Sequence, residues 1–210
     1  MANTVITIAR QYGSGGKTVG RMLSEDLGIH FYNREILRLA SDASGISEQI
    51  FGENDEKIKT GILQRIAKKI NIGDVLPPDS DDFLSTTNLF NYQAKVIRQL
   101  AETESCVIVG RCADYILKDY DNVVRVFVHG PFDFCLEQAM RVNAKPENEM
   151  RKLIAKRDKY RGDYYKHYTG QDWYDARNYD LCLDSSKLGF EGCVEAIKAY
   201  MAVRGLSIEK

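Results

Sequence analysis

Val5-Ile6-Thr7-Ile8-Ala9 is followed by Arg10-Gln11-Tyr12 and then by Gly13-Ser14-Gly15-Gly16-Lys17-Thr18, and the organisation of the whole chain depends on this segment. The first run is apolar and β-branched, which is typical of a buried β-strand. Glycines have no Cβ, so the loop backbone can adopt positive φ and direct successive N–H groups toward one point. A helical pattern that begins near Gly16 adds unpaired N–H groups and the positive end of a helix dipole. The segment therefore predicts a strand, a phosphate-binding loop and a helix.

The loop matches most of the pattern G-x-x-x-x-G-K-[ST]. Gly16, Lys17 and Thr18 fill the last three places, whereas Gln11 stands where the first glycine is expected. In this pattern the lysine binds the β- and γ-phosphates and the threonine hydroxyl binds Mg²⁺. The alternative is a glycine-rich hairpin turn with a solvated lysine, which the flanking strand and helix disfavour. We therefore predict a nucleotide-binding set with Lys17 as a catalytic residue and Thr18 as the metal ligand: Gly13, Ser14, Gly15, Gly16, Lys17 and Thr18.

The composition is that of one ordinary globular domain. The 210 residues are 44% apolar and 28% charged, and 29 Lys and Arg face 30 Asp and Glu. This near balance gives no basis for a nucleic-acid or membrane surface, and no segment resembles a signal peptide or is long enough to cross a bilayer. The five cysteines form no C-x-x-C pair, and Cys106, Cys135 and Cys182 lie in apolar stretches where buried free thiols are expected. We predict a cytoplasmic protein without a nucleic-acid or membrane partner.

Strand patterns alternate with helical patterns along the chain. The expected strands are residues 5–9, 29–32, 106–109, 123–128 and 179–183. Helices are expected at residues 16–27, 131–142 and 190–203. Three more helices should begin after Asn33, which would be the N-cap, at about residue 85 and at about residue 146. This alternation predicts a parallel sheet with right-handed crossovers, in which ligands bind at the carboxyl ends of the strands. The loop, Arg111, His129 and Asp184 each follow a strand and should converge.

The segment between residues 41 and 104 has no strand pattern. Ile58, Ile62, Ile66 and Ile70 recur at helical spacing, and residues 71–82 contain Pro77-Pro78 and four aspartates, which indicates a loop. We expect an all-helical insertion between two strands of the sheet.

A basic segment with interleaved tyrosines precedes the last strand. Pro146-Glu147 opens a predicted helix on which helical spacing places Arg157, Arg161 and Tyr164 on one face. This segment is either a solvated basic helix, an RNA-binding surface or a mobile arm that brings guanidinium groups to a phosphate. The overall charge balance argues against RNA. Arginine suits the third role because its planar fork is bidentate.

Phosphoryl transfer consists mostly of positioning and charge neutralisation, so arginines near the loop are the candidates for catalysis. Arg111 at a strand end and Arg157 and Arg161 on the basic segment fit this role. Val109 is followed by Gly110-Arg111 where a motor ATPase or GTPase would have an aspartate for Mg²⁺. A small-molecule kinase tolerates its absence, because Thr18, phosphates and water can hold the ion.

The sequence resembles the cytidylate kinase-like family of nucleoside monophosphate kinases. The matching motifs are Ile6–Arg10 with Tyr12–Lys17, Phe31–Glu35, Val109-Gly110-Arg111, Arg157-Asp158 and Tyr179-Asp180-Leu181. The resemblance implies an α/β, three-layer P-loop NTPase fold with a mostly parallel sheet of about five strands and helices on both faces. It also implies a single kinase domain, whose parts are a core at about residues 1–32, 101–145 and 172–210, an acceptor-binding helical insert at about 33–100, and a lid at about 146–171.

The resemblance further implies ATP and Mg²⁺ as cofactors and small nucleotides as substrates. Lys17 would bind ATP, and Arg111 the acceptor phosphate. Arg141, Arg157 and Arg161 would contact the transferring group. The implied acceptor-binding residues are Asn33, Arg34, Arg38, Arg111 and His129.

Some positions depart from the family pattern. Asn33, Cys112 and His129 stand where cytidylate kinases have aspartates, and Cys112 in particular replaces a carboxylate poorly as a hydrogen-bond acceptor. The spacing of Arg157 and Arg161 also differs from the family's lid motif. CMP is therefore the nominal acceptor, and a nucleotide-binding module without turnover or a kinase for a non-nucleotide metabolite are the alternatives. The acceptor, the choice of ATP or GTP and the oligomeric state stay open at this point.

Overall fold

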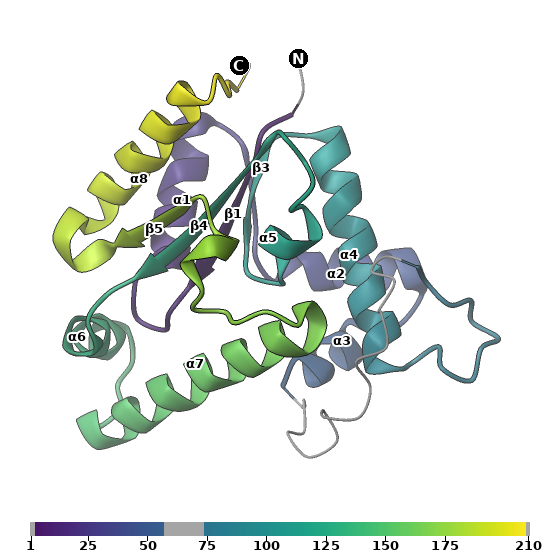
Figure 1. Ribbon diagram of the computed structural model, residues 1–210. Helices are drawn as coiled ribbons and strands as arrows, with labels where there is room; N and C mark the ends of the chain where they lie inside the picture. The colour runs from purple at the N-terminus through teal and green to yellow at the C-terminus, as the bar shows by residue number, and fades with distance from the viewer. Residues whose placement is uncertain (1–2, 57–73, 209–210) are drawn as a thin grey trace.

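The computed structural model describes residues 3–56 and 74–208, so the isoleucine repeat at residues 58–70 lies outside the described part. A five-stranded sheet forms the centre of the fold, and all its neighbouring strands are parallel (Figure 1). Its strands are β1 (Val5–Arg10), β2 (His30–Tyr32), β3 (Cys106–Val109), β4 (Val123–His129) and β5 (Leu181–Asp184). The strand order is β2-β3-β1-β4-β5, which confirms the predicted parallel sheet and puts β1, with its loop, in the middle.

Helices cover both faces of this sheet, because successive strand residues point to opposite faces. The helices are α1 (Gly16–Leu27), α2 (Glu35–Ser44), α3 (Glu48–Glu56), α4 (Thr86–Thr103), α5 (Ala113–Ile116), α6 (Phe132–Val142), α7 (Glu147–Thr169) and α8 (Ser185–Val203). Ile6 and Ile8 of β1 pack with α1 and α8 in one core, whereas Val5 and Ala9 pack with α2, α4 and α5 in the other. The fold is therefore the three-layer α/β architecture that the sequence predicted.

The carboxyl ends of the strands lie at one edge of the sheet. Ile8 of β1 is in register with Val109 of β3, Arg10 with Val128 of β4, and His129 with Asp184 of β5. Helix α7 runs along this edge (Figure 1). The loop after β1, the turn after β3 and the end of β4 are thus neighbours, as the alternation of strands and helices predicted.

Four local predictions are wrong. Asn33 does not cap α2: its backbone N–H donates to Glu35 Oε2 at 2.9 Å, and Arg34 is the N-cap residue with helical backbone angles. The last strand begins at Leu181 rather than Tyr179, and α8 begins at Ser185 rather than Phe190, with non-helical angles at Gly189. All five cysteines are free thiols, but Cys182 is exposed because β5 is an edge strand.

Helices α2, α3 and α4 occupy the predicted insert, and α7 occupies the predicted lid. Tyr168, near the end of α7, stacks on Phe90 of α4 with ring centroids 3.9 Å apart, and its hydroxyl donates to Thr86 O at 3.2 Å. The two segments therefore touch each other. Their roles as acceptor-binding insert and lid stay predictions.

Candidate active site

The loop between β1 and α1 has the backbone of a phosphate cradle. Gly13 and Gly15 are left-handed, with φ of 85° and 78°. Ser14 Oγ donates to Gln11 O and to Val128 O, both at 3.0 Å, which ties the loop to itself and to β4. Among the described residues no side chain caps α1, and Val19 N–H donates to Gly15 O. The first turn of α1 therefore presents its N–H groups to the loop as an anion-binding end.

Close packing explains why both positions are glycine. A Cβ on Gly13 would lie 2.1 Å from Cys135 O of α6, and one on Gly15 would lie 2.2 Å from the Phe190 ring of α8. Positive φ and lack of space act together at each position. Helices α6 and α8 consequently hold the loop from both sides.

Gln11, at the place of the missing first glycine, uses its side chain to hold the loop. Gln11 Oε1 accepts the backbone N–H of Gly130 at 3.1 Å, just after β4. Ser185 Oγ, at the start of α8, donates to Ser14 O at 2.7 Å and to His129 O at 3.0 Å. Side-chain hydrogen bonds thus fix the loop to the ends of β4 and β5.

Lys17 and Thr18 project from the first turn of α1 with exposed side chains. The Lys17 charge helps to lower the pKa of Glu35, although hydrogen bonds from the Glu35 backbone contribute more. Glu35 opens α2 directly after Asn33 and Arg34, so this helix start lies within electrostatic reach of the loop. Arg34 and Arg38 are exposed, and Asn33 is half-buried.

The turn after β3 has a strained backbone. Gly110, Arg111 and Cys112 are all left-handed, with φ of 81°, 62° and 53°. A left-handed conformation costs a non-glycine residue about 1–2 kcal/mol, and such strain concentrates at functional sites. Gly110 N–H donates to Ile8 O at 3.0 Å, which joins the turn to β1. The turn therefore lies against β1, the strand that leads into the phosphate loop.

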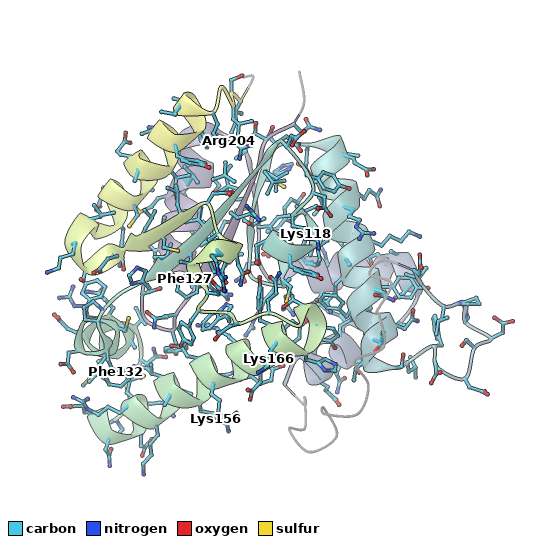
Figure 2. The ribbon with its side chains drawn as sticks, in the orientation of Figure 1. Lys118, Phe127, Phe132, Lys156, Lys166 and Arg204 are labelled. Atoms are coloured by element: carbon cyan, nitrogen blue, oxygen red, sulfur yellow. The ribbon has the colours of Figure 1, made fainter. Side chains whose placement is uncertain are left out.

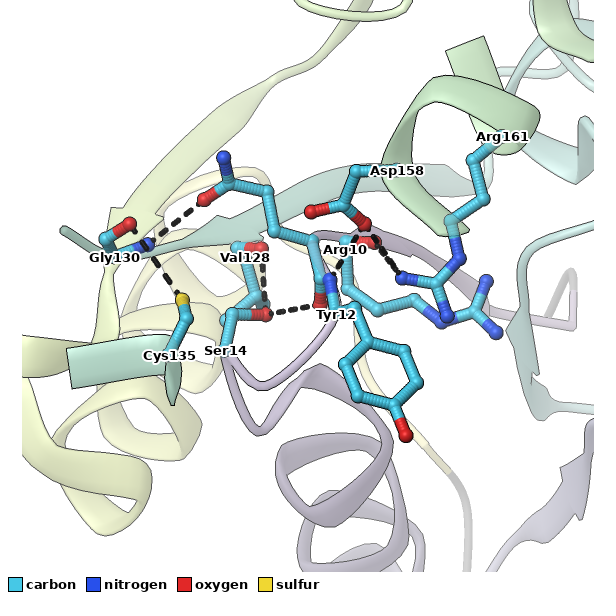
Figure 3. A network of polar contacts seen from close by, with 9 residues as sticks. Arg10, Tyr12, Ser14, Val128, Gly130, Cys135, Asp158 and Arg161 are labelled. Atoms are coloured by element: carbon cyan, nitrogen blue, oxygen red, sulfur yellow. Dashed lines mark hydrogen bonds and ion pairs between the residues drawn. The ribbon is translucent and has the colours of Figure 1, made fainter. Parts of the chain in front are cut away.

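Helix α7 is hydrogen-bonded to the phosphate loop (Figure 3). Asp158 Oδ1 accepts the backbone N–H of Tyr12 at 2.7 Å and pairs with Arg161 Nη1 at 3.1 Å. Arg161 Nη1 also donates to Arg10 O at 3.1 Å, and its guanidinium lies 5.6 Å from the centre of the Tyr12 ring. Burial raises the pKa of Asp158 and lowers the pKa of Arg161. The basic helix is therefore attached to the loop by a partly buried ion pair.

The other end of α7 is anchored beside the Arg111 turn. Tyr165 OH donates to Asp114 Oδ2 at 2.7 Å, and Asp114 belongs to α5, which follows that turn. Burial raises the pKa of Asp114 to about 6. Lys156 and Lys166 lie on the exposed side of α7 (Figure 2). The helix thus turns different basic residues toward solvent and toward the loop.

The structure gathers some predicted site residues and separates others. The phosphate loop, the Arg111 turn and Arg161 meet at the carboxyl edge of the sheet. Arg157 is exposed, and its charge contributes to the lowered pKa of Arg161. Arg141 lies on the exposed side of α6, where it pairs with Glu137 one turn away. His129 lies beside Asp184 on the β4–β5 side of β1, whereas Asn33, Arg34 and Arg38 lie on the β2 side.

Residue patterns did not single out three groups of this site. Asp158, Glu35 and Arg10 occur in the sequence only as parts of the motifs that match the family. Asp158 stands three positions before Arg161, a spacing that allows an ion pair on a helix, and this was the available signal.

The loop fits a triphosphate with Mg²⁺. Residues 3–56 and 74–208 contain no group of three or more His, Cys, Asp and Glu that could hold a metal ion. Magnesium keeps several waters and binds mainly through substrate phosphates, so Thr18 as the protein ligand fits that ion. No helix in the described part of the chain is long and apolar enough to cross a membrane.

A phosphate loop at the centre of a parallel sheet, with an arginine-bearing helix attached to it, is the arrangement of P-loop kinases. The chain belongs to the cytidylate kinase-like family, whose model matches residues 5–187. It is 27% identical to a cytidylate kinase of Thermococcus sibiricus over 93% of this chain and 86% of that protein. It is 24% identical to a cytidylate kinase of Methanopyrus kandleri over 94% of this chain and 92% of that protein.

Solved structures with the same fold include an uncharacterized protein from Eubacterium ventriosum. Its TM-score is 0.70 at 26% identity, over 95% of this chain and 99% of that chain. Shikimate kinase from Bacteroides thetaiotaomicron has a TM-score of 0.55 at 12% identity, over 95% and 98% of the two chains, and shows the likeness of the fold. The family and the fold together support a phosphotransferase.

Proposed function

We propose that the protein transfers the γ-phosphoryl group of ATP, with Mg²⁺, to a small phosphate acceptor of the nucleoside monophosphate class. The observation that carries this proposal is the meeting of three elements at one sheet edge. These are the phosphate loop, the strained Arg111 turn, and Arg161 on α7, which donates to Arg10 O. The cytidylate kinase names of the relatives make CMP the first acceptor to test.

Each element has a separate role in this proposal. Lys17 and the N–H groups at the start of α1 bind the β- and γ-phosphates, and Thr18 contributes a hydroxyl to Mg²⁺. Arg111 binds the acceptor phosphate from the strained turn after β3. Arg161 neutralises charge on the phosphoryl group as it passes between the two. Arg157, exposed one turn before Arg161 on the same helix, is a further candidate for this role.

The acceptor side supports a second candidate, a kinase for a non-nucleotide metabolite. Cys112 stands where cytidylate kinases have an aspartate, and it is 4% exposed. The carboxylate that follows it, Asp114, is buried and accepts a hydrogen bond from Tyr165. That carboxylate is therefore engaged within the protein and does not replace the missing acceptor for a cytosine amino group.

A test of both candidates measures ADP release from ATP·Mg²⁺ with CMP, dCMP, UMP, AMP and GMP, and then with sugar and hydroxy-acid acceptors. We expect turnover above acceptor-free ATP hydrolysis with at least one monophosphate. Lys17→Ala should abolish it, because the loop loses its phosphate-binding charge. Lys118→Ala, on the surface over the Tyr115 ring, is the matched control and should keep it.

The outcomes separate the candidates. Turnover with a non-nucleotide acceptor alone favours the second candidate. ATP binding without turnover on any acceptor favours a nucleotide-binding module and overturns both kinase proposals.

The five free cysteines also support a reducing compartment such as the cytoplasm for this activity.

A further inference from the structure

We propose that Arg10 is a further phosphate-binding residue, which contacts the γ-phosphoryl group of bound ATP. This inference rests on the proposed function, because it assumes that ATP occupies the loop. Arg10 is the last residue of β1 and directly precedes the loop, and it is half-buried. The pattern G-x-x-x-x-G-K-[ST] begins one residue later, at Gln11, and gives this position no role.

Two glycines make room for the Arg10 side chain. A Cβ on Gly16, at the start of α1, would lie 2.5 Å from Arg10 Cβ and 3.0 Å from its Cγ. A Cβ on Gly110, in the turn after β3, would lie 2.5 Å from Arg10 Nη1. The side chain therefore passes the phosphate loop and ends with its guanidinium against the Arg111 turn.

This position lies between the two groups that react in the proposed transfer. The donor phosphates bind at Gly16–Thr18, and the acceptor phosphate binds at Arg111. A γ-phosphoryl group carries its charge on three equatorial oxygens during transfer, and an arginine fork matches two of them at once. Arg10 reaches from one binding element to the other, so its guanidinium is suited to stay in contact with the phosphoryl group during transfer.

The surroundings of Arg10 concentrate cationic groups near that path. Arg161 Nη1 donates to Arg10 O, and both side chains extend to the same side of the loop (Figure 3). The Arg10 charge favours the ionised form of Asp158, the carboxylate that pairs with Arg161. The Asp158 carboxylate therefore pairs with one guanidinium group and lies within electrostatic reach of a second, at the loop where the polyphosphate is proposed to bind.

A brace between β1 and the β3 turn is the structural alternative, and nucleotide affinity distinguishes the two. A brace affects ATP and ADP equally, because it acts through the shape of the loop. A contact with the γ-phosphoryl group affects only the triphosphate. Losing a hydrogen bond to a charged group weakens binding by about ten- to a hundredfold.

The experiment titrates the full-length chain with Mg²⁺ and either ADP or the non-hydrolysable β,γ-imido analogue of ATP, in a calorimeter. Arg10→Gln should weaken the triphosphate analogue by about tenfold or more and change ADP affinity by less than about threefold. Arg10→Lys keeps the charge without the fork and should fall between wild type and Arg10→Gln. Thermal melting of each variant establishes that it is folded.

A second variant moves Arg10 without removing it. Gly110→Ala places a methyl group on the Arg10 guanidinium and should also weaken the triphosphate more than ADP. Gly45→Ala is the matched control, since Gly45 has φ of 74° and open space around its Cβ position. It carries the same backbone strain and should leave both affinities unchanged.

The other possible results overturn the inference, the proposed function or both, and they can be told apart. Equal losses for the analogue and ADP in Arg10→Gln make Arg10 a brace, and unchanged affinities remove it from the site. A wild type that binds neither nucleotide overturns this inference together with the proposed function. If Arg10→Gln weakens binding of the triphosphate analogue more than binding of ADP, but the wild-type protein phosphorylates no acceptor, the proposed function alone is overturned.

Discussion

Asp158 Oδ1 accepts the backbone N–H of Tyr12 at 2.7 Å, so that a side chain of α7 is bonded to the main chain of the phosphate loop. The same oxygen pairs with Arg161 Nη1 at 3.1 Å. Asp158 is 8% exposed, and water therefore competes little for these bonds. The position of the basic helix and the conformation of the loop are consequently linked through one carboxylate.

Removing this carboxylate should affect both stability and activity. Asp158→Ala leaves a partly buried N–H unsatisfied and should lower the free energy of unfolding by about 1–3 kcal/mol. Asp158→Asn should cost less, because its amide oxygen still accepts from Tyr12. Both should lower kcat, since Arg161 loses its partner. Urea denaturation and ADP release measure the two effects.

Asp163→Asn is the matched control on the same helix. Asp163 pairs with Lys159 one turn away at the surface, where an ion pair contributes less than about 1 kcal/mol. If Asp158→Ala were no less stable than Asp163→Asn, the bond to the loop would contribute nothing.

Gln11→Gly restores the first glycine of the phosphate-loop pattern. The substitution removes the hydrogen bond from Gly130 N–H to Gln11 Oε1 and adds backbone freedom to the unfolded chain, so the free energy of unfolding should fall by about 1 kcal/mol. Turnover at saturating ATP should stay near the wild-type value, because Lys17 and the N–H groups of α1 are unchanged. A loss of kcat without a loss of stability would instead put the Gln11 side chain in the reaction.

Local signals in the sequence predicted the centre of the fold. The apolar run of β1 and the glycines before Lys17 each act through neighbouring residues, so strand, loop and helix could be read directly. Alternating strands and helices then predicted the parallel sheet, because such connections leave few topologies. The convergence of the loop with the Arg111 turn followed from that topology.

Features that depend on distant residues could not be predicted. Asp158 and Tyr12 are 146 positions apart, and only the folded chain brings them together. Cys182 lies in an apolar run like a buried strand, but β5 is at the edge of the sheet, which a strand's own sequence does not reveal. Local side-chain hydrogen bonds also set the starts of helices. Asp184 accepts Ser186 N–H at 3.0 Å as the N-cap of α8, so this helix begins before Gly189 rather than after it.

Variants of Arg111 in the strained turn after β3 should lose activity alike but differ in stability. Arg111→Gly and Arg111→Ala both remove the guanidinium and should lose turnover. Glycine tolerates the φ of 62°, whereas alanine keeps the strain, so the glycine variant should be more stable than the alanine variant by about 0.5–1 kcal/mol. Comparing these two variants cancels the contacts of the arginine side chain. Equal stabilities would mean that the turn relaxes without cost once the side chain is absent.

The buried carboxylate of Asp114 should make stability depend on pH in a defined direction. Burial raises its pKa from 3.8 to about 6, although the hydrogen bond from Tyr165 and the nearby charge of Arg125 oppose this. The folded protein then holds the proton more tightly than the unfolded chain. The stabilisation from this residue is therefore complete below about pH 4 and is lost as the pH rises through about 6, a change of about 2–3 kcal/mol.

Asp114→Asn is neutral at every pH and keeps an oxygen for the Tyr165 hydroxyl, so it should gain stability relative to wild type by that amount between pH 4 and 7. Urea denaturation at four pH values in this range measures the difference in free energy of unfolding between Asp114→Asn and wild type. The contributions of the other titrating groups cancel in this difference. Tyr165→Phe removes the hydrogen bond that lowers the Asp114 pKa. In this variant the pH-dependent loss of stability that accompanies ionisation of Asp114 should therefore extend to higher pH than in wild type. A constant difference between Asp114→Asn and wild type across this range would mean that folding does not shift the pKa of this carboxylate.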